Sequence, residues 1–345
     1  MKKITRLIVE QLIISGNKLE LQNRDLSYLD LSNLVLSKSN LEGANLEETN
    51  LEEASLEEVN LQGVNLQGAN LQGANLEDIY LKRANLEGVN LEGVNLFMVD
   101  LERANLKKIV LKNANLQSAK LFMVNLEGAI LKGANFEDAE MQRAKLGKAN
   151  LTDVNLSDVN LEWANLKDAN LEGATLIRTN LKGTIFLNAN LNGVNLNGAN
   201  LEGANLEGAS LINATSKWGI HKRGNFENSN LQGANFSNAN LKEANLQSAN
   251  LSYAVFENTT FVGANLKGAN LESANLSGAN LICANLSGAN LSNANLVDSN
   301  LTDTDLSSSN LSGSNLKGAN VSGAKIKNSF PNDNIWKETT GIPET

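Results

Sequence analysis

His221 is the only histidine in this chain of 345 residues, so it is the one imidazole that could act as a base beside a serine or cysteine nucleophile. It stands in the segment Ser216–Arg223, which reads Ser-Lys-Trp-Gly-Ile-His-Lys-Arg. Cys283 is the only cysteine. One cysteine and one histidine cannot build a disulfide framework or a Cys/His zinc site within a single chain. Since the sequence also lacks a glycine-rich phosphate loop, we expect no metal, no cofactor and no enzymatic activity.

Leucine recurs at every fifth residue from Leu26 onward, and this period defines the elements that must position any site. The series has 61 positions, of which 50 hold leucine. Only Ser216 and His221 place polar side chains in it. A repeat of this length predicts a solenoid and not a globular core. The remaining positions hold other apolar residues: Phe136, Met141, Phe186, Phe226, Phe236, Phe256, Phe261, Val321 and Ile326.

A period of five excludes the common regular elements. On an α-helix, a five-residue step turns about 500°, so the leucines would spiral around the axis. A simple strand alternates with period two, and five is odd. The commonest repeat is Ala-Asn-Leu-x-Gly, as in residues 69–73. Its leucine and the alanine two residues earlier share a face, and its glycine suits a turn with positive φ. We therefore predict an all-β fold with a turn in every repeat.

The run Ala44-Asn45-Leu46 and its many relatives resemble the pentapeptide-repeat family, whose pattern is Ala-(Asn/Asp)-Leu-x-x. The resemblance covers about residues 24–326. It implies a right-handed, four-sided (quadrilateral) β-helix with twenty residues per coil, and hence about 15 coils. Some members of this family resemble duplex DNA and bind gyrase.

The expected organisation has three parts. Residues 1–18 carry an amphipathic pattern and are expected to form a helical cap on the exposed sheet edge of the first coil, with a membrane-surface role as the alternative. Residues 19–326 form the β-helix, with an irregular segment or loop at 215–225. Residues 327–345 form a C-terminal capping tail that includes Phe330, Ile335 and Trp336. We expect no signal peptide and no membrane span, and a cytoplasmic location.

The segment around His221 has two interpretations. It forms a loop that bulges from one side with His221 exposed, or a loop that contacts a partner. Trp218, flanked by Lys222 and Arg223, has the composition of a binding hot spot. The sequence leaves open whether the segment bulges or stays within the coil.

Arginine and large apolar residues gather on one predicted wall. Residues twenty apart should stack, so positions that elsewhere hold asparagine, glycine and small polar residues can be compared coil by coil. The alternative interpretation is sequence drift at exposed positions of the repeat. In that case Asp100, Lys120 and Glu140 only form a charge ladder between neighbouring strands. The composition resembles an interface, and we hypothesise that it binds a protein partner or forms a homodimer. The candidate residues on the wall are Tyr80, Arg83, Arg103, Phe122, Met123, Arg143 and Trp163, and Phe97 and Met98 lie on the turn that leads into it.

The net charge and its distribution favour some functions over others. The formal net charge is −9, which disfavours direct binding of nucleic acid. Residues 41–60 contain seven glutamates and no basic residue, and form a solvated collar or an acidic docking patch. A non-catalytic interaction scaffold is the preferred function. The alternative is a DNA mimic that modulates gyrase or another topoisomerase, although duplex DNA is far more densely charged.

Overall fold

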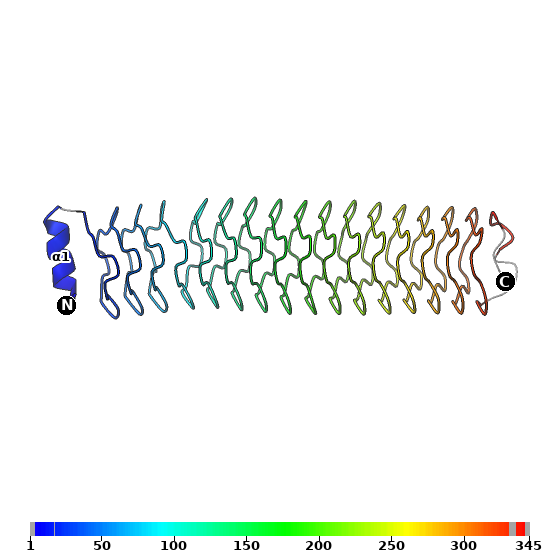
Figure 1. Cartoon of the computed structure of the whole chain (residues 1–345), viewed down its shortest axis with the longest axis horizontal. Coiled ribbons are helices and arrows are strands. Elements are labelled where there is room, and N and C mark those ends of the chain that lie inside the picture. Colours follow the sequence, from blue (N-terminus) through cyan, green and yellow to red (C-terminus); the bar gives the residue numbers. More distant parts are fainter. Residues whose placement is uncertain (1–3, 17, 331–335, 342–345) are drawn as a thin grey trace. The chain divides into compact units, whose positions relative to one another are not determined.

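The computed structural model describes residues 4–16, 18–330 and 336–341 (Figure 1). Clustering of contacts divides the chain into two compact units, Met1–Ala169 and Asn170–Thr345. Among the described residues, the single α-helix is α1, Arg6–Ile14. The rest is built from isolated β-bridges and turns, so the predicted β-helix of pentapeptide repeats is confirmed in its coarse form.

Parallel β-bridges join residues that lie twenty apart in the sequence. Asn45 pairs with Asn65 in the first unit, and Asn205 pairs with Asn225 in the second. Outside residues 69–79, the leucine after a bridge residue typically donates its N–H to the next coil, as Leu46 does to the Asn65 carbonyl at 2.7 Å. These bonds satisfy backbone groups that would otherwise form an open edge. The register explains why the leucine period is kept so strictly.

The core of each unit is a column of leucines with smaller side chains between them. Leu101 and Ala104 in the first unit are 0% and 1% exposed, and Leu201 and Ala204 in the second are equally buried. Full burial of one leucine contributes about 2 kcal/mol. The asparagine before each leucine stacks on its counterparts: Asn85 Nδ2 donates to Asn65 Oδ1 at 2.8 Å.

The second residue after each leucine has positive φ, as expected for a glycine turn. Gly73 and Gly203 have φ values of 69° and 65°. Many other residue types adopt the same conformation, including Arg103 at 57° and Trp163 at 60°. Such a conformation costs a side-chain-bearing residue about 1 kcal/mol, while glycine loses more backbone entropy on folding. Glycine is therefore favoured at this position and is not required.

Helix α1 packs against the first coil of its unit. Val9 is fully buried, and the Arg6 guanidinium donates to the carbonyls of Asp30 and Ser32 at 3.1 and 3.2 Å. Leu7 and Ile14 remain exposed, so only part of the predicted apolar face is covered. Within the described residues, we find no helix with the length and apolar character needed to cross a bilayer.

The tail after Ile326 continues the pairing where it is described. Phe330 bridges to Asn310, and Thr340 bridges to Asn320. Ile335, which was assigned to the capping tail, lies outside the described residues.

The prediction of an irregular segment or loop at 215–225 is wrong. Thr215 and Ile220 keep the parallel bridges of the repeat, and His221 is buried at 0% exposure. The physical reason lies in two glycines at positions where alanine is usual. A Cβ at Gly219 would lie 2.5 Å from both His221 Nε2 and Ser216 Oγ, and one at Gly224 would lie 2.9 Å from the Phe226 ring. The two glycines leave room for an imidazole and a phenyl ring inside the coil.

A Gly219→Ala substitution should lower the free energy of unfolding by about 1–3 kcal/mol, because the added methyl group overpacks the His221 environment. The matched control is Gly147→Ala, whose Cβ would meet only the Lys167 carbonyl at an ordinary 3.6 Å. That control should be neutral or stabilising by up to about 1 kcal/mol. Urea unfolding followed by circular dichroism measures both, and equal effects would contradict the packing argument.

Candidate functional site

The predicted wall exists as a stacked surface within the first unit. Tyr80, Asp100, Lys120 and Glu140 form consecutive parallel bridges. The turn residues stack in the same register, since Arg103 N–H donates to the Phe122 carbonyl at 2.9 Å. We call this surface the Tyr80–Trp163 wall. It comprises Tyr80, Arg83, Arg103, Phe122, Met123, Arg143 and Trp163, together with Phe97 and Met98 on the preceding turn.

Large apolar side chains on this wall are open to solvent. Tyr80, Phe97, Met98 and Trp163 expose 57%, 51%, 63% and 56% of their surface. Phe122 is only half-buried, which is less exposed than we expected, because it lies one residue after its leucine, between the Glu102 and Gln142 positions of the stack. Met123 is 43% exposed, and Arg83, Arg103 and Arg143 are exposed as well.

The predicted ladder of Asp100, Lys120 and Glu140 forms no ion pair within the described part of the chain. An ion pair on this wall joins residues two positions after Tyr80 and Asp100: Lys82 Nζ lies 2.6 Å from Glu102 Oε2. The hydrogen bond from Lys82 lowers the pKa of Glu102. The wall therefore has an ion pair between neighbouring coils, although not between the residues named in the predicted ladder.

One polar atom on the wall has no partner. Gln142 Oε1 is buried and accepts no hydrogen bond from any described residue. A buried acceptor without a donor is costly, and such groups usually bond to protein or to ordered water. Gln142 lies between Phe122 and Glu162 in the stack.

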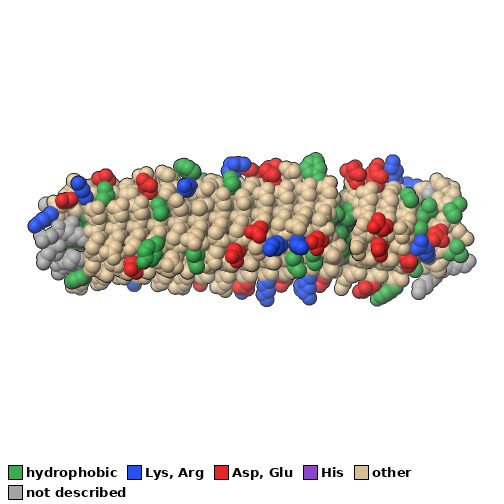
Figure 2. All heavy atoms as spheres, turned by 180° about the vertical axis from the view of Figure 1, so that it is seen from behind, with side chains coloured by type: hydrophobic (Ala, Val, Ile, Leu, Met, Phe, Trp, Pro, Cys, Tyr) green, Lys and Arg blue, Asp and Glu red, His purple; other side chains and the backbone are tan. Residues whose placement is uncertain are grey.

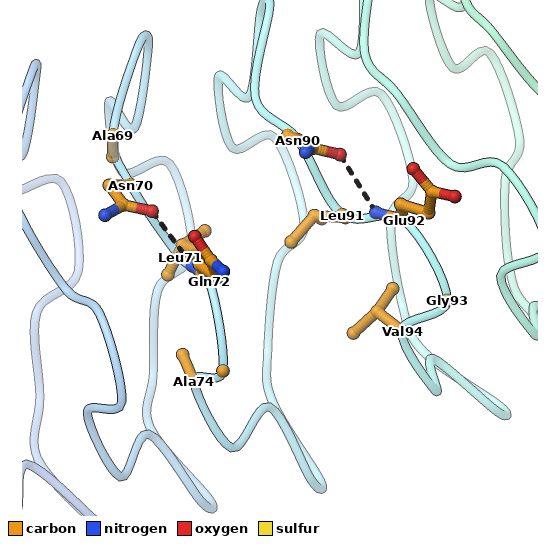
Figure 3. Close-up of a pocket in the computed structure, with 11 residues that line it drawn as sticks. Ala69, Asn70, Leu71, Gln72, Ala74, Asn90, Leu91, Glu92, Gly93 and Val94 are labelled. Carbon is orange, nitrogen blue, oxygen red and sulfur yellow. Dashed lines mark hydrogen bonds between the residues drawn. The ribbon is translucent and has the colours of Figure 1, made fainter.

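A cleft, which the sequence did not indicate, opens beside Tyr80. Bridges join Asn65 to Asn85 and Tyr80 to Asp100, but none of the described bridges joins residues 69–79 to 89–99. Figure 2 shows the cleft as a break in the surface. In Figure 3, Asn70 Oδ1 and Asn90 Oδ1 each accept the N–H of the residue two further along, and no drawn bond joins Asn70 to Asn90.

The cleft has two parts. One has a volume of about 480 Å³ and is lined by residues 69–74 and 90–94. The other has a volume of about 540 Å³ and is lined by residues 76–80 and 95–100 with Glu58 and Lys120. Tyr80, Phe97 and Met98 of the wall line this second part. Ala74 and Val94 are half-buried here, whereas the equivalent Ala54 and Ala114 in the neighbouring coils are buried, so the core itself reaches the cleft.

The structure also brings a serine and the histidine together, in the second unit. Ser216 Oγ lies 2.8 Å from His221 Nε2, which is the separation of a nucleophile and its base. Both side chains are 0% exposed and lie among aromatic rings, with the Phe236 centroid 4.9 Å from that of His221. Burial lowers the pKa of His221 to about 3, so the ring is neutral. No substrate can reach this pair, and we interpret it as part of the core.

The remaining predicted residues near His221 are on the outside of the second unit. Trp218 is 64% exposed. Arg223 Nε donates to Glu243 Oε2 at 2.8 Å, and this bond lowers the pKa of Glu243. Lys222 is half-buried. Trp218 therefore stays a candidate contact, on a regular turn and not on a loop.

Cys283 is exposed and free. Among the residues that the structure describes, no group of three or more His, Cys, Asp and Glu side chains is arranged to hold a metal ion.

A family model described as pentapeptide repeats matches this chain in eight copies. These cover residues 25–63, 60–96, 121–158, 155–193, 189–215, 225–258, 249–282 and 284–323. A search of curated proteins finds no match.

Several solved structures are similar to parts of the chain. A pentapeptide repeat protein of the Arabidopsis thaliana thylakoid lumen is 24% identical, covers 33% of this chain and 88% of its own, and has a TM-score of 0.29. HetL, from the cyanobacterium Nostoc sp. strain PCC 7120 and involved in regulating heterocyst differentiation, is 24% identical over 86% and 98%, with a TM-score of 0.22. QnrB1, a plasmid-mediated fluoroquinolone resistance protein, is 18% identical over 64% and 91%, with a TM-score of 0.27. All three TM-scores are below 0.5, so these structures give no guide to what this chain binds.

The buried imidazole makes stability depend on pH. The unfolded chain protonates His221 below about pH 6.5, whereas the folded chain does so only near pH 3. The unfolded state therefore binds more protons in this window, and the stability present at neutral pH is lost as the pH falls through it. His221 alone should lower the free energy of unfolding by about 1.4 kcal/mol per pH unit.

A His221→Leu substitution should remove this contribution, as measured by urea unfolding between pH 7 and pH 4. Ser216→Ala is the control, because it leaves the imidazole buried and should keep the slope. An unchanged slope in the leucine variant would show that His221 does not titrate on unfolding.

Proposed function

Because the chain belongs to the pentapeptide-repeat family, we propose that it is a non-catalytic interaction protein that binds a protein partner through the Tyr80–Trp163 wall. In this proposal the four-sided, right-handed β-helix of about fifteen coils is the scaffold, with α1 as its cap. The scaffold fixes inward side chains and leaves only outward ones free to vary. The free thiol of Cys283 fits a cytoplasmic location.

The observation that carries the proposal is the exposure of Tyr80, Phe97, Met98 and Trp163 among exposed arginines on one wall. Aromatic residues, methionine and arginine are enriched in protein interfaces, and tryptophan, tyrosine and arginine dominate hot spots. The unpartnered Gln142 Oε1 adds an acceptor that a partner could satisfy. A second copy of this chain is one possible partner, and size-exclusion chromatography would reveal it.

The proposal excludes catalysis for a physical reason. The only histidine, His221, has Ser216 within hydrogen-bond distance, and both side chains are sealed in the core. A nucleophile must reach its substrate at about 3 Å to react.

A double substitution of Met123 and Trp163 to glycine should abolish partner binding without unfolding the wall. Both residues have positive φ, which glycine adopts freely, so the free energy of unfolding should change by less than about 1 kcal/mol. Loss of two exposed hot-spot side chains should weaken binding at least about 30-fold. Affinity capture from the native host, with co-purifying proteins quantified, measures the loss.

The matched control for this experiment is Tyr253→Gly, in the second unit. Tyr253 is also 56% exposed and has a φ of 59°, so the change is equivalent outside the wall. Equal capture by the wall variant, the control and the unmodified protein would contradict the proposal.

The gyrase alternative gives a separate prediction. One coil adds about 4.8 Å of axis, over which duplex DNA carries about three negative charges. This chain has a net charge of −9 in total, and its wall carries Arg83, Arg103 and Arg143. We expect no inhibition of DNA supercoiling by gyrase at micromolar protein. Inhibition that survives the Met123 and Trp163 double substitution would favour the DNA mimic.

A further inference from the structure

The cleft in the first unit presents unpaired backbone on both of its sides. In the preceding coil, Leu51, Glu53 and Leu56 donate their N–H groups to the carbonyls of Asn70, Gln72 and Asn75 at 2.7–2.9 Å. One coil later, none of the described backbone bonds uses the equivalent donors. These are the N–H groups of Leu71, Gly73, Leu76 and Asp78.

The opposite side of the cleft presents the matching acceptors. In the closed pattern, those donors would meet the carbonyls of Asn90, Glu92, Asn95 and Phe97. Each side is paired with its outer neighbour, since Leu51 donates to Asn70 on one side and Leu91 donates to Val110 on the other, both at 2.7 Å. The asparagine stack is broken in the same place. The two sides are therefore ordered strand edges and not frayed ends.

The shape and spacing of these groups select an extended polypeptide as the occupant. Within each repeat, the donors and the acceptors lie two residues apart along the edge, which matches an added strand. The lining is mixed, with polar groups at the rim and four buried leucines at the inner end: Leu71, Leu91, Leu76 and Leu96. The cleft spans two successive repeats, which are separated by the turns at Gly73 and Gly93. An occupant that follows it must therefore be extended within each repeat and turn between them, and it then needs two inward apolar side chains about five residues apart.

The charge of the cleft indicates the kind of peptide. Five carboxylates line it, against the single lysine Lys120. Glu92 pairs with Lys112 at 2.8 Å and Glu58 with Lys38 at 3.5 Å. The other three form no ion pair with any described residue; they are Glu77, Asp78 and Asp100. A second copy of the same cleft would bring the same negative charges, so charge disfavours self-pairing.

We propose that the cleft is a strand-addition site that takes up an extended, basic segment of the protein partner. This inference rests on the proposed function and specifies the chemistry of that partner. The added strand completes the backbone pairing between residues 69–79 and 89–99. Its apolar side chains fill the gap between the leucine layers, and its lysines or arginines neutralise the carboxylates at the rim.

The first experiment uses synthetic peptides and the full-length chain. A fluorescein-labelled ten-residue peptide with leucines five apart and lysines between them should bind, as measured by fluorescence anisotropy. A twin with glutamates in place of lysines should bind at least about tenfold more weakly. A third peptide, which is basic but N-methylated at alternate amides, should also bind at least about tenfold more weakly, because its methylated amides cannot donate to the strand edges.

Charge-reversal variants locate the binding. The double substitution Glu77→Lys and Asp78→Lys should weaken binding of the basic peptide about tenfold or more. Glu137→Lys with Asp138→Lys is the matched control, since these residues occupy the same repeat positions on the same wall, three coils further along. Equal weakening by both pairs, or full binding of the N-methylated peptide, would overturn strand addition.

Hydrogen exchange tests the open edges directly. In the free protein, the amides of Leu71, Gly73 and Leu76 should exchange about 100-fold faster than those of Leu51, Glu53 and Leu56. Binding of the basic peptide should slow the exchange of the Leu71, Gly73 and Leu76 amides. Equal protection in the free chain would mean that the cleft closes on itself, which overturns the inference.

The two proposals can fail separately. If the Met123 and Trp163 double substitution abolishes partner capture while no peptide binds the cleft, the strand-addition inference fails and the proposed function stands. If the peptide binds the cleft while partner capture is unaffected by that substitution, the wall fails as the binding surface.

Discussion

Backbone pairing between residues twenty apart is the interaction on which the rest of this structure depends. Each coil satisfies the N–H and C=O groups of its neighbours, and the leucine that follows each bridge residue then points inward. The asparagine stack repeats the same pairing in side chains. One register therefore determines the core, the turns and the outer surface together. Where that register is kept, the interior leaves no room for chemistry, and a function must lie on the outside or where the pairing stops.

The sequence predicted the parts of the fold that repeat. The leucine spacing predicted the buried column, and the turn glycines predicted the positive φ. It failed at Ser216 and His221 because we judged each position against the leucine rule alone. The compensation comes from neighbours: Gly219 and Gly224 give up side-chain volume that an imidazole and Phe226 then occupy. A polar residue in a core position is thus tolerated when adjacent positions become smaller.

The candidate site was predicted only in part, for a related reason. Residue types on the wall could be compared along the chain, so Tyr80, Met98 and Trp163 were found, whereas the half-burial of Phe122 depends on its neighbours in the stack. The cleft gives no sequence signal, since residues 69–73 show the commonest form of the repeat. Backbone pairing involves two neighbouring coils. The repeat pattern of the sequence alone cannot show that one particular pair of coils stays apart.

The wall and the cleft are physically continuous, because Tyr80, Phe97 and Met98 belong to both. Their contributions to binding differ in kind. Backbone pairing along a strand edge provides affinity with little discrimination among sequences, since every peptide offers the same amides. Exposed aromatic side chains and the rim carboxylates discriminate by shape and charge. A partner that covers both would place its strand in the cleft and its specific contacts on the wall. The acidic rim, which repels a second copy of the chain, then also prevents the open edges from pairing with each other.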